Sequence, residues 1–181
     1  MSPQQSYHKR HLVPFGEFIP PGFGWVLEIM HIPMSDFARG DAGQPPLKVA
    51  GQRVAVNICY EDVFGDEIAR RAADSTLLVN MSNVAWFGDS LAPAQHLQIA
   101  RLRAIETGRM HLTATNTGIT AAIDRDGRVL GRLPQFAEAR LEVAAQGYEG
   151  MTPYLQLYDW PIVLFSLLWL ALFTIRARFI R

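Results

Sequence analysis

One short stretch, Arg53-Val-Ala-Val-Asn-Ile-Cys-Tyr-Glu-Asp62, carries the residues best suited to chemistry. Its apolar run 54–58 predicts a buried strand that ends at Cys59, the single cysteine of the sequence, and 63–73 predicts a helix. A thiol between a strand and a helix lies at the carboxyl edge of a sheet, where backbone N–H groups favour a thiolate or an oxyanion. This stretch alone leaves two interpretations open: Cys59 is a nucleophile, or it is a small buried hydrophobic residue.

A second group of reactive side chains lies in the N-terminal segment 6–20, above all Lys9 and Glu17. The prolines and glycines of this segment predict a loop, and charged groups in such loops often belong to sites. The alternative is a solvated surface loop. The strongly apolar stretch 18–34 follows, with a short helix predicted over 27–31. It is either a lid, ligand groove or membrane-facing patch, or a loop packed on the core.

The remaining elements indicate an α/β fold. Residues 47–49 and 54–56 predict a hairpin about 50–52. Further predicted strands are 76–82, 111–116, the hairpin 119–123 with 128–133, and 139–145; a loop is predicted over 83–90 and a helix over 93–108. Buried strands that alternate with helices imply a mixed or parallel sheet whose carboxyl ends gather the site. Cys59, Asn80–Asn83 and Asn116 all fall at the carboxyl ends of such strands, and this convergence favours the catalytic interpretation of Cys59.

Composition and residue types argue against nucleic-acid binding, an internal disulfide, a metal site and a signal peptide. Lys plus Arg and Asp plus Glu both number 17 among 181 residues, so there is no basic surplus for binding nucleic acid. One cysteine cannot form an internal disulfide. The five histidines lack the spacings of zinc sites, so we expect no metal. The start, Met1 to Tyr7, is polar, so we expect no signal peptide.

The C-terminal run 161–175 is free of charge and is followed by Arg176, Arg178 and Arg181. At 1.5 Å per residue it spans roughly 22 Å, against about 30 Å for the core of a bilayer. Flanking aromatic residues can extend it into the interfaces while the arginines snorkel. We therefore predict a transmembrane helix with a cytoplasmic C-terminus and residues 1–155 on the other side of the membrane. The alternative is a buried core helix.

Three blocks of the sequence together resemble the signature motifs of the nitrilase, or carbon–nitrogen hydrolase, superfamily. They are Tyr7-His-Lys-Arg-His-Leu-Val-Pro-Phe-Gly-Glu17, Asn57-Ile-Cys-Tyr-Glu61 and Asn80-Met-Ser-Asn-Val-Ala-Trp-Phe-Gly88. Within that superfamily they are similar to the bacterial apolipoprotein N-acyltransferases, as are residues 95–109, 114–120 and 152–154. The resemblance runs in order along nearly the whole chain.

The resemblance implies an incomplete nitrilase-like α-β-β-α sandwich over residues 1–155 and one transmembrane helix over 156–181. In the family's Glu-Lys-Cys catalytic set, Cys59 would be the nucleophile and Lys9 the lysine. Glu17 matches a further glutamate beside that lysine, and we include it in the catalytic group. The expected substrate-binding residues are Tyr60, Glu61, Trp86 and Phe87. Trp86 and Phe87 could equally pack in the core.

The implied reaction is an acyl transfer in two steps. A phospholipid gives its acyl chain to the thiolate as a thioester, and the α-amine of a diacylglyceryl-cysteine on a lipoprotein takes it. The ammonium of Lys9 and the backbone N–H of Tyr60 are the expected donors to the oxyanion. No cofactor is implied. The implied location is the bacterial inner membrane, with the catalytic domain on the periplasmic face.

The sequence also departs from the family pattern. The family's general base is a glutamate well upstream of the lysine, and Lys9 is almost at the start of the sequence. Val84 stands where the motif has an aspartate. We therefore expect the C-terminal part of a larger enzyme, inactive alone and exposing apolar sheet surface. Two alternatives remain: a nitrilase-type amidase that hydrolyses a small C–N bond, and a non-catalytic membrane-anchored remnant.

Overall fold

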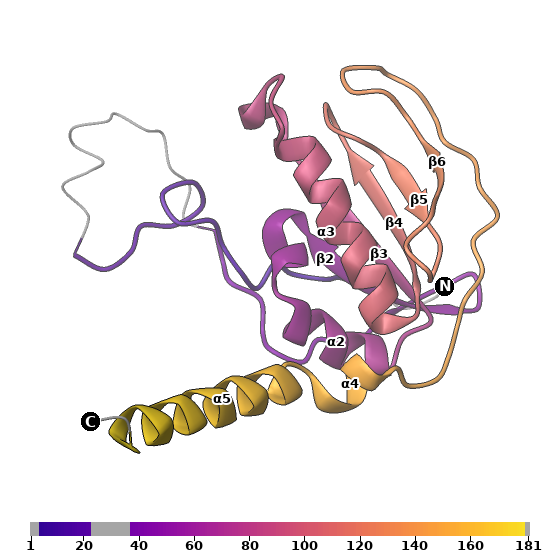
Figure 1. Ribbon diagram of the computed structural model, residues 1–181. Helices are drawn as coiled ribbons and strands as arrows, with labels where there is room; N and C mark the ends of the chain where they lie inside the picture. Colours follow the sequence, from indigo (N-terminus) through magenta and orange to yellow (C-terminus); the bar gives the residue numbers. More distant parts are fainter. Residues whose placement is uncertain (1–3, 23–36, 180–181) are drawn as a thin grey trace.

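A computed structural model of the protein describes residues 4–22 and 37–179, with side chains described as far as Arg176. The predicted helix at 27–31 and most of the apolar stretch 18–34 lie outside the described residues. One six-stranded mixed sheet organises the fold, in the order β1 (Leu47–Val49), β2 (Gln52–Ile58), β3 (Leu77–Ser82), β4 (Met110–Thr115), β5 (Ala121–Ile123) and β6 (Val129–Arg132) (Figure 1). The three central strands run parallel and the outer pairs are antiparallel. The predicted α/β class and both hairpins are confirmed.

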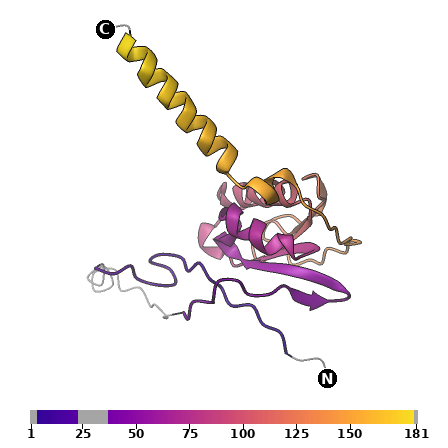
Figure 2. The same ribbon diagram turned by 90° about the horizontal axis from the view of Figure 1, so that it is seen from below.

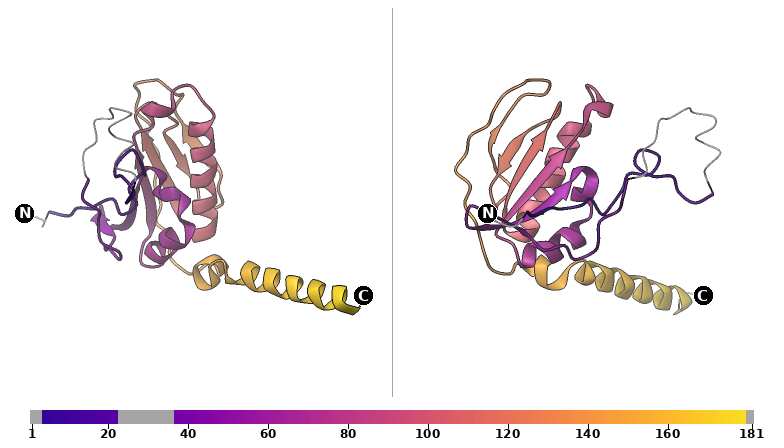
Figure 3. Two further views of the ribbon diagram at one scale, coloured as in Figure 1. Left: turned by 90° about the vertical axis from the view of Figure 1, so that its left-hand side faces the viewer. Right: turned by 180° about the vertical axis from the view of Figure 1, so that it is seen from behind.

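Two helices cover one face of this sheet, α2 (Gly65–Ala73) and α3 (Ala92–Thr107), as Figures 1 and 3 show. They are the crossovers that parallel strands require. Ala55 and Leu78 meet the buried Ile68 of α2, and Ile123 meets Ala104 of α3. The prediction for α3 is confirmed, because Gly108 ends it with the left-handed φ of 64° that glycine adopts easily.

The other face of the sheet buries its own set of apolar residues, Val54, Val56, Leu77 and Met110. The two sets alternate along β2 and β3, as the period of two demands. Tyr7 and Tyr148 pack against this second face, and Val79 and Leu112 are only partly buried there. Within the described ranges, therefore, helices lie on one side of a single sheet.

The prediction of a strand over 139–145 is wrong. These residues, all described, form no regular element, and most of their side chains are exposed. The long connection after β6 is held at its end, where the backbone N–H of Tyr148 donates to the carbonyl of Thr76 at 3.0 Å. A strand needs a continuous ladder of such bonds to a neighbour, and residues 139–145 have no paired strand beside them.

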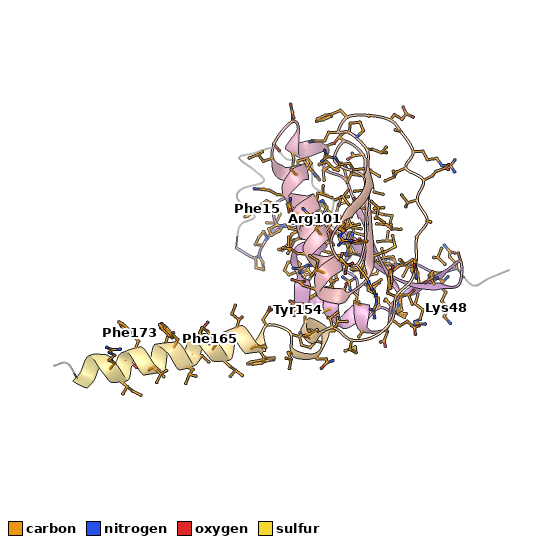
Figure 4. The ribbon with its side chains drawn as sticks, turned by 45° about the vertical axis from the view of Figure 1, so that its right-hand side comes forward. Phe15, Lys48, Arg101, Tyr154, Phe165 and Phe173 are labelled. Atoms are coloured by element: carbon orange, nitrogen blue, oxygen red, sulfur yellow. The ribbon has the colours of Figure 1, made fainter. Side chains whose placement is uncertain are left out.

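The C-terminal part begins with α4 (Pro153–Leu157), whose N-cap Thr152 accepts from the backbone N–H of Leu155 at 3.1 Å. Leu155 is buried against α2. The following helix, α5 (Trp160–Phe179), projects away from the body of the protein (Figures 2 and 3). Its apolar side chains are exposed along its whole described length, and Figure 4 shows Phe165 and Phe173 reaching into open space.

The structure does not support the transmembrane helix predicted over 156–181. In the part of the chain that the structure describes, no helix combines the length and the apolar character needed to cross a membrane. The alternative of a buried core helix is wrong, since the side chains of α5 are exposed.

Candidate active site

Cys59 lies at the point where β2 ends and the short 3-10 helix η1 (Cys59–Val63) begins. Its φ of 57° is in the left-handed region, which costs free energy for any residue with a Cβ. Strain of this kind is found where a reactive side chain is presented on a sharp turn between a strand and a helix. The helix predicted from residue 63 begins instead at Gly65, because η1 occupies residues 59–63.

A buried network of side-chain hydrogen bonds fixes the backbone of this turn. Asn57 and Asn80 face each other in the parallel register of β2 and β3. The Nδ2 of Asn80 donates to Oδ1 of Asn57 at 2.5 Å and to the carbonyl of Cys59 at 2.9 Å. Ser82 donates to Oδ1 of Asn80 at 2.5 Å. The sequence placed Asn80 at the correct edge, but only the register of the strands reveals that its amide fixes the backbone of Cys59.

The chemical state of the Cys59 thiol reflects opposing influences. Burial raises the pKa of Cys59, and the ammonium of Lys9 and the backbone N–H of Tyr60 act against this effect. The carboxylate of Glu17 raises the pKa of Cys59 further, and the hydroxyl of Ser82 lowers it. Because burial prevails, Cys59 needs a group that accepts its proton before it can attack as a thiolate.

The structure brings Lys9 and Glu17 to the same place as Cys59. The Nζ of Lys9 lies 2.7 Å from Oε1 of Glu17, and both side chains are mostly buried. The other carboxylate oxygen of Glu17 accepts from the backbone N–H of Val13 at 2.9 Å, which fixes the loop around the lysine. The ammonium of Lys9 also lies 5.5 Å from the ring centre of Tyr60. The loop predicted for this segment therefore carries a fixed ion pair.

Cys59, Lys9 and Glu17 line one cavity of about 660 Å³. Tyr60, Trp86 and Phe87 line it, and Trp86 and Phe87 come from the 3-10 helix η2 (Ala85–Phe87). Their exposed fractions, 69% and 51%, show that they are not core residues. The lining is mainly apolar, with Val13, Phe37, Ile58, Val63, Val84, Ala92 and Ile99 among its members. Such a wall suits a hydrocarbon chain.

Glu61 occupies a different place from the one expected of a substrate-binding residue. Its side chain is buried, with 1% exposed, and it is not among the residues that line the cavity. Its carboxylate accepts from the hydroxyl of Tyr7 and from the backbone N–H groups of Arg10, His11 and Ile58, at 2.7–3.1 Å. Glu61 thus ties the segment that carries Lys9 to the strand that carries Cys59.

A further buried cluster was not singled out from the sequence as functional. Asp62 is fully buried, with Oδ1 3.2 Å from Nε2 of His111 on β4 and Oδ2 3.3 Å from Nε2 of His96 on α3. Burial alone would raise the pKa of Asp62, but the two histidines outweigh it and leave that pKa well below its usual range. His96 lines the same cavity as Cys59. Its position in the first half of the helix after β3, at the carboxyl edge of the sheet, was the available signal.

A comparison with protein families agrees with this fold. The carbon–nitrogen hydrolase family model matches residues 2–148, and the chain belongs to this family. Among its curated relatives the chain is similar to apolipoprotein N-acyltransferases. It is 60% identical to that of Nitrosomonas europaea over 157 residues, 86% of this chain and 32% of the relative. It is 50% identical to that of Bordetella bronchiseptica over 173 residues, 91% of this chain and 32% of the relative. The chain thus spans about a third of the length of these relatives.

Solved structures show the same fold at low sequence identity. The NitFhit protein of C. elegans superposes with a TM-score of 0.54 at 20% identity, over 71% of this chain and 31% of that one. A carbon–nitrogen hydrolase from Helicobacter pylori G27 gives a TM-score of 0.51 at 14% identity, over 56% of this chain and 43% of that one. The mixed sheet with its helical cover is therefore a nitrilase-like α/β fold.

Proposed function

We propose that this chain carries the nucleophile of an apolipoprotein N-acyltransferase. It would transfer an acyl chain from a phospholipid, through a thioester on Cys59, to the N-terminal amine of a diacylglyceryl-cysteine lipoprotein. The observation that carries this proposal is the position of Cys59 and the Lys9–Glu17 ion pair on one large and mainly apolar cavity. The similarity to relatives of that name supports it.

Six residues of the cavity have a role in this reaction. The thiolate of Cys59 attacks the ester carbonyl, and the C–O bond to the glycerol oxygen breaks when the tetrahedral intermediate collapses. The ammonium of Lys9 and the backbone N–H of Tyr60 stabilise the oxyanion, since both already interact favourably with a negative charge on the sulfur. Glu17 positions Lys9. Trp86 and Phe87 contact the acyl chain.

The source of the acyl donor implies a location. A phospholipid resides in a bilayer, so the cavity must work at a membrane surface. The exposed apolar side chains of α5 support association with a membrane. The bacterial inner membrane, with residues 1–155 as the catalytic domain on the periplasmic face, belongs to the same proposal.

One alternative reaction follows from the family itself, whose name denotes hydrolysis of carbon–nitrogen bonds. A small amide could also form a thioester with Cys59 and release ammonia. The apolar cavity opposes this alternative, because a small polar amide gains little from such a wall.

The test is intact-protein mass spectrometry of the chain in phospholipid vesicles, with Cys59→Ala as the control. A competent site would gain an acyl mass that hydroxylamine removes and that the control lacks. The same measurement is made on a chimera that places the preceding part of the Nitrosomonas europaea relative before residue 1. An adduct on the chimera alone would mean that this chain needs the remaining part of the enzyme.

Two other results would contradict the proposal. Ammonia release from simple amides without an acyl adduct would identify an amidase. No adduct on the chain or the chimera, with no ammonia released, would leave a non-catalytic remnant.

A further inference from the structure

Val84 is the residue of the cavity wall at which this chain departs from the family motif. The motif has an aspartate there, and this chain has the methyl groups of valine instead. Val84 follows β3, lines the same cavity as Cys59 and is 3% exposed. A carboxylate loses water wherever a hydrocarbon chain lies against it, whereas methyl groups gain from that contact. The valine therefore makes this part of the wall suitable for hydrocarbon.

The neighbouring strand sets the position of Val84. β3 and β4 lie side by side (Figure 1), and Asn116 follows β4. The Oδ1 of Asn116 accepts from the backbone N–H of Val84 at 3.0 Å, and its Nδ2 donates to Oδ1 of Asn83 at 2.7 Å. These two bonds fix the backbone that carries Val84 against the turn after β4.

Gly118, in that turn, packs against the side chain of Val84. It is buried and does not line the cavity. A Cβ added to Gly118 would lie 2.6 Å from Cγ2 of Val84, far inside van der Waals contact. The φ of Gly118 is not in the left-handed region, so space and not backbone conformation requires a glycine here. The open space beside Val84 is the cavity, and a methyl group at 118 would push Cγ2 into it.

We propose that Val84, supported by Gly118, selects a long hydrocarbon acyl group for the cavity, and this inference rests on the proposed acyl transfer. Cys59 follows β2, and Val84 follows the neighbouring strand β3. A short acyl group on the sulfur stays beside Cys59, whereas a long one extends along the apolar wall to which Val84 belongs. Val84 is a specificity-determining residue in this scheme, because it contacts the acyl chain and takes no part in proton transfer.

The test is a competition between two activated esters, p-nitrophenyl dodecanoate and p-nitrophenyl acetate, for the full chain. The thiolate of Cys59 attacks the carbonyl, the C–O bond breaks, and p-nitrophenolate leaves with the electron pair; the thiol proton goes to the buffer. This leaving group needs no proton from the protein, so the assay does not depend on the remaining part of the enzyme. Intact mass gives the ratio of dodecanoyl to acetyl adducts that hydroxylamine removes, with Cys59→Ala as the blank. Each variant is compared with the wild type in the same detergent, so partition of the esters cancels.

For Gly118→Ala we expect the ratio of dodecanoyl to acetyl adducts to fall roughly tenfold, the scale on which one methylene changes acceptance by an apolar pocket. In a Val84→Ala background the same change should have little effect, because no Cγ2 remains to be displaced. The matched control is Gly131→Ala, whose added Cβ would lie 3.2 Å from the side chain of Leu141, outside the cavity. An unchanged ratio for Gly118→Ala, or an equal fall in the Val84→Ala background, would overturn the inference.

Val84→Thr covers the case in which Gly118→Ala fails to fold. Threonine has nearly the shape of valine, but its hydroxyl loses water against hydrocarbon, so the ratio should fall at least about threefold. If neither ester acylates the chain, displacement of cis-parinaric acid by lauric acid from Cys59→Ala measures the same preference. Equal ratios, or equal affinities for lauric acid with and without Val84→Thr, would remove Val84 from substrate selection.

The outcomes separate this inference from the proposed function. A ratio that depends on Val84, without acyl transfer from phospholipid to the chain or the chimera, would remove the acyltransferase and leave a wall that binds hydrocarbon. Acyl transfer from phospholipid, with a ratio that no change at 84 or 118 alters, would leave the acyltransferase and overturn the role of Val84.

Discussion

The charge of Lys9 is the strongest influence that opposes burial at the Cys59 thiol. Glu17 binds Lys9 at 2.7 Å and is itself fixed by a backbone N–H, so the ammonium cannot move away from the cavity. A positive charge at this place stabilises a thiolate, and later an oxyanion, without any rearrangement of the protein. The reactivity of Cys59 is thus controlled by a residue fifty positions earlier in the sequence.

Replacing Lys9 by Met should therefore make Cys59 less reactive at neutral pH. Burial already raises the pKa of the thiol, and loss of the ammonium raises it further, so the fraction of thiolate falls. We expect alkylation by iodoacetamide at pH 7.5 to slow by roughly three- to tenfold, with the two rates converging at high pH where both thiols are ionised. The control is Lys48→Met, because Lys48 is the other lysine of the sequence and its side chain is exposed on β1 (Figure 4). Equal rates for the two variants would contradict this prediction.

At the scale of elements, Glu61 joins three parts of the fold. Its carboxylate accepts hydrogen bonds from the N-terminal segment, including the hydroxyl of Tyr7, and from the backbone N–H at the end of β2. The third part is η1, to which Glu61 itself belongs. Arg71 of α2 donates in turn to the hydroxyl of Tyr7 at 2.5 Å and to the carbonyl of Val56 at 2.7 Å. This arrangement sets the distance between the loop that carries Lys9 and the strand that carries Cys59.

Substituting Gln for Glu61 should loosen that connection. One oxygen becomes an NH₂ group that faces other donors, and the charge that strengthens these bonds is lost. We expect the free energy of unfolding in urea to fall by about 2 to 4 kcal/mol. Glu142→Gln is the matched control, because that glutamate pairs with Arg140 on the exposed connection and should change stability by less than about 0.5 kcal/mol. A loss of stability no larger than that of the control would show that the hydrogen bonds of Glu61 are not needed.

At the scale of the whole molecule, α5 stands apart from the domain. The body of the protein ends with Leu155 packed on α2, and α5 extends beyond it with its apolar side chains uncovered (Figure 2). These side chains contribute little to the stability of the domain, because they bury little area against it. They are available to a membrane or to another apolar surface.

Removal of residues 160–181 should therefore separate folding from association. We expect the truncated chain to unfold in urea at the same midpoint as the full chain, measured by circular dichroism in detergent. Binding to phosphatidylglycerol vesicles in a flotation assay should fall at least about tenfold, since most of the exposed apolar area is lost. Flotation of the truncated chain to the same extent would instead assign membrane binding to the cavity or to the partly uncovered sheet face.

Much of the fold was determined by local patterns. The buried runs before Cys59 and Asn80, the hairpin turns and the stop at Gly108 were all predicted, since each depends on residues that are neighbours in the sequence. The wrong strand also has a local cause, because residues 139–145 have an apolar pattern but no strand beside them.

The sequence by itself determined that Cys59 stands at the end of a buried strand, and its motifs, by their resemblance to a family, linked Cys59 to Lys9 and Glu17. Only the tertiary structure decided how these groups meet. The parallel register of β2 and β3 brings the amide of Asn80 to the backbone carbonyl of Cys59, and the packing of α3 brings His96 to Asp62. It also made Glu61 a buried connection instead of a cavity residue. The physical reason is that the position of a side chain in a site depends on strand register and helix packing, which join residues 23 to 51 positions apart.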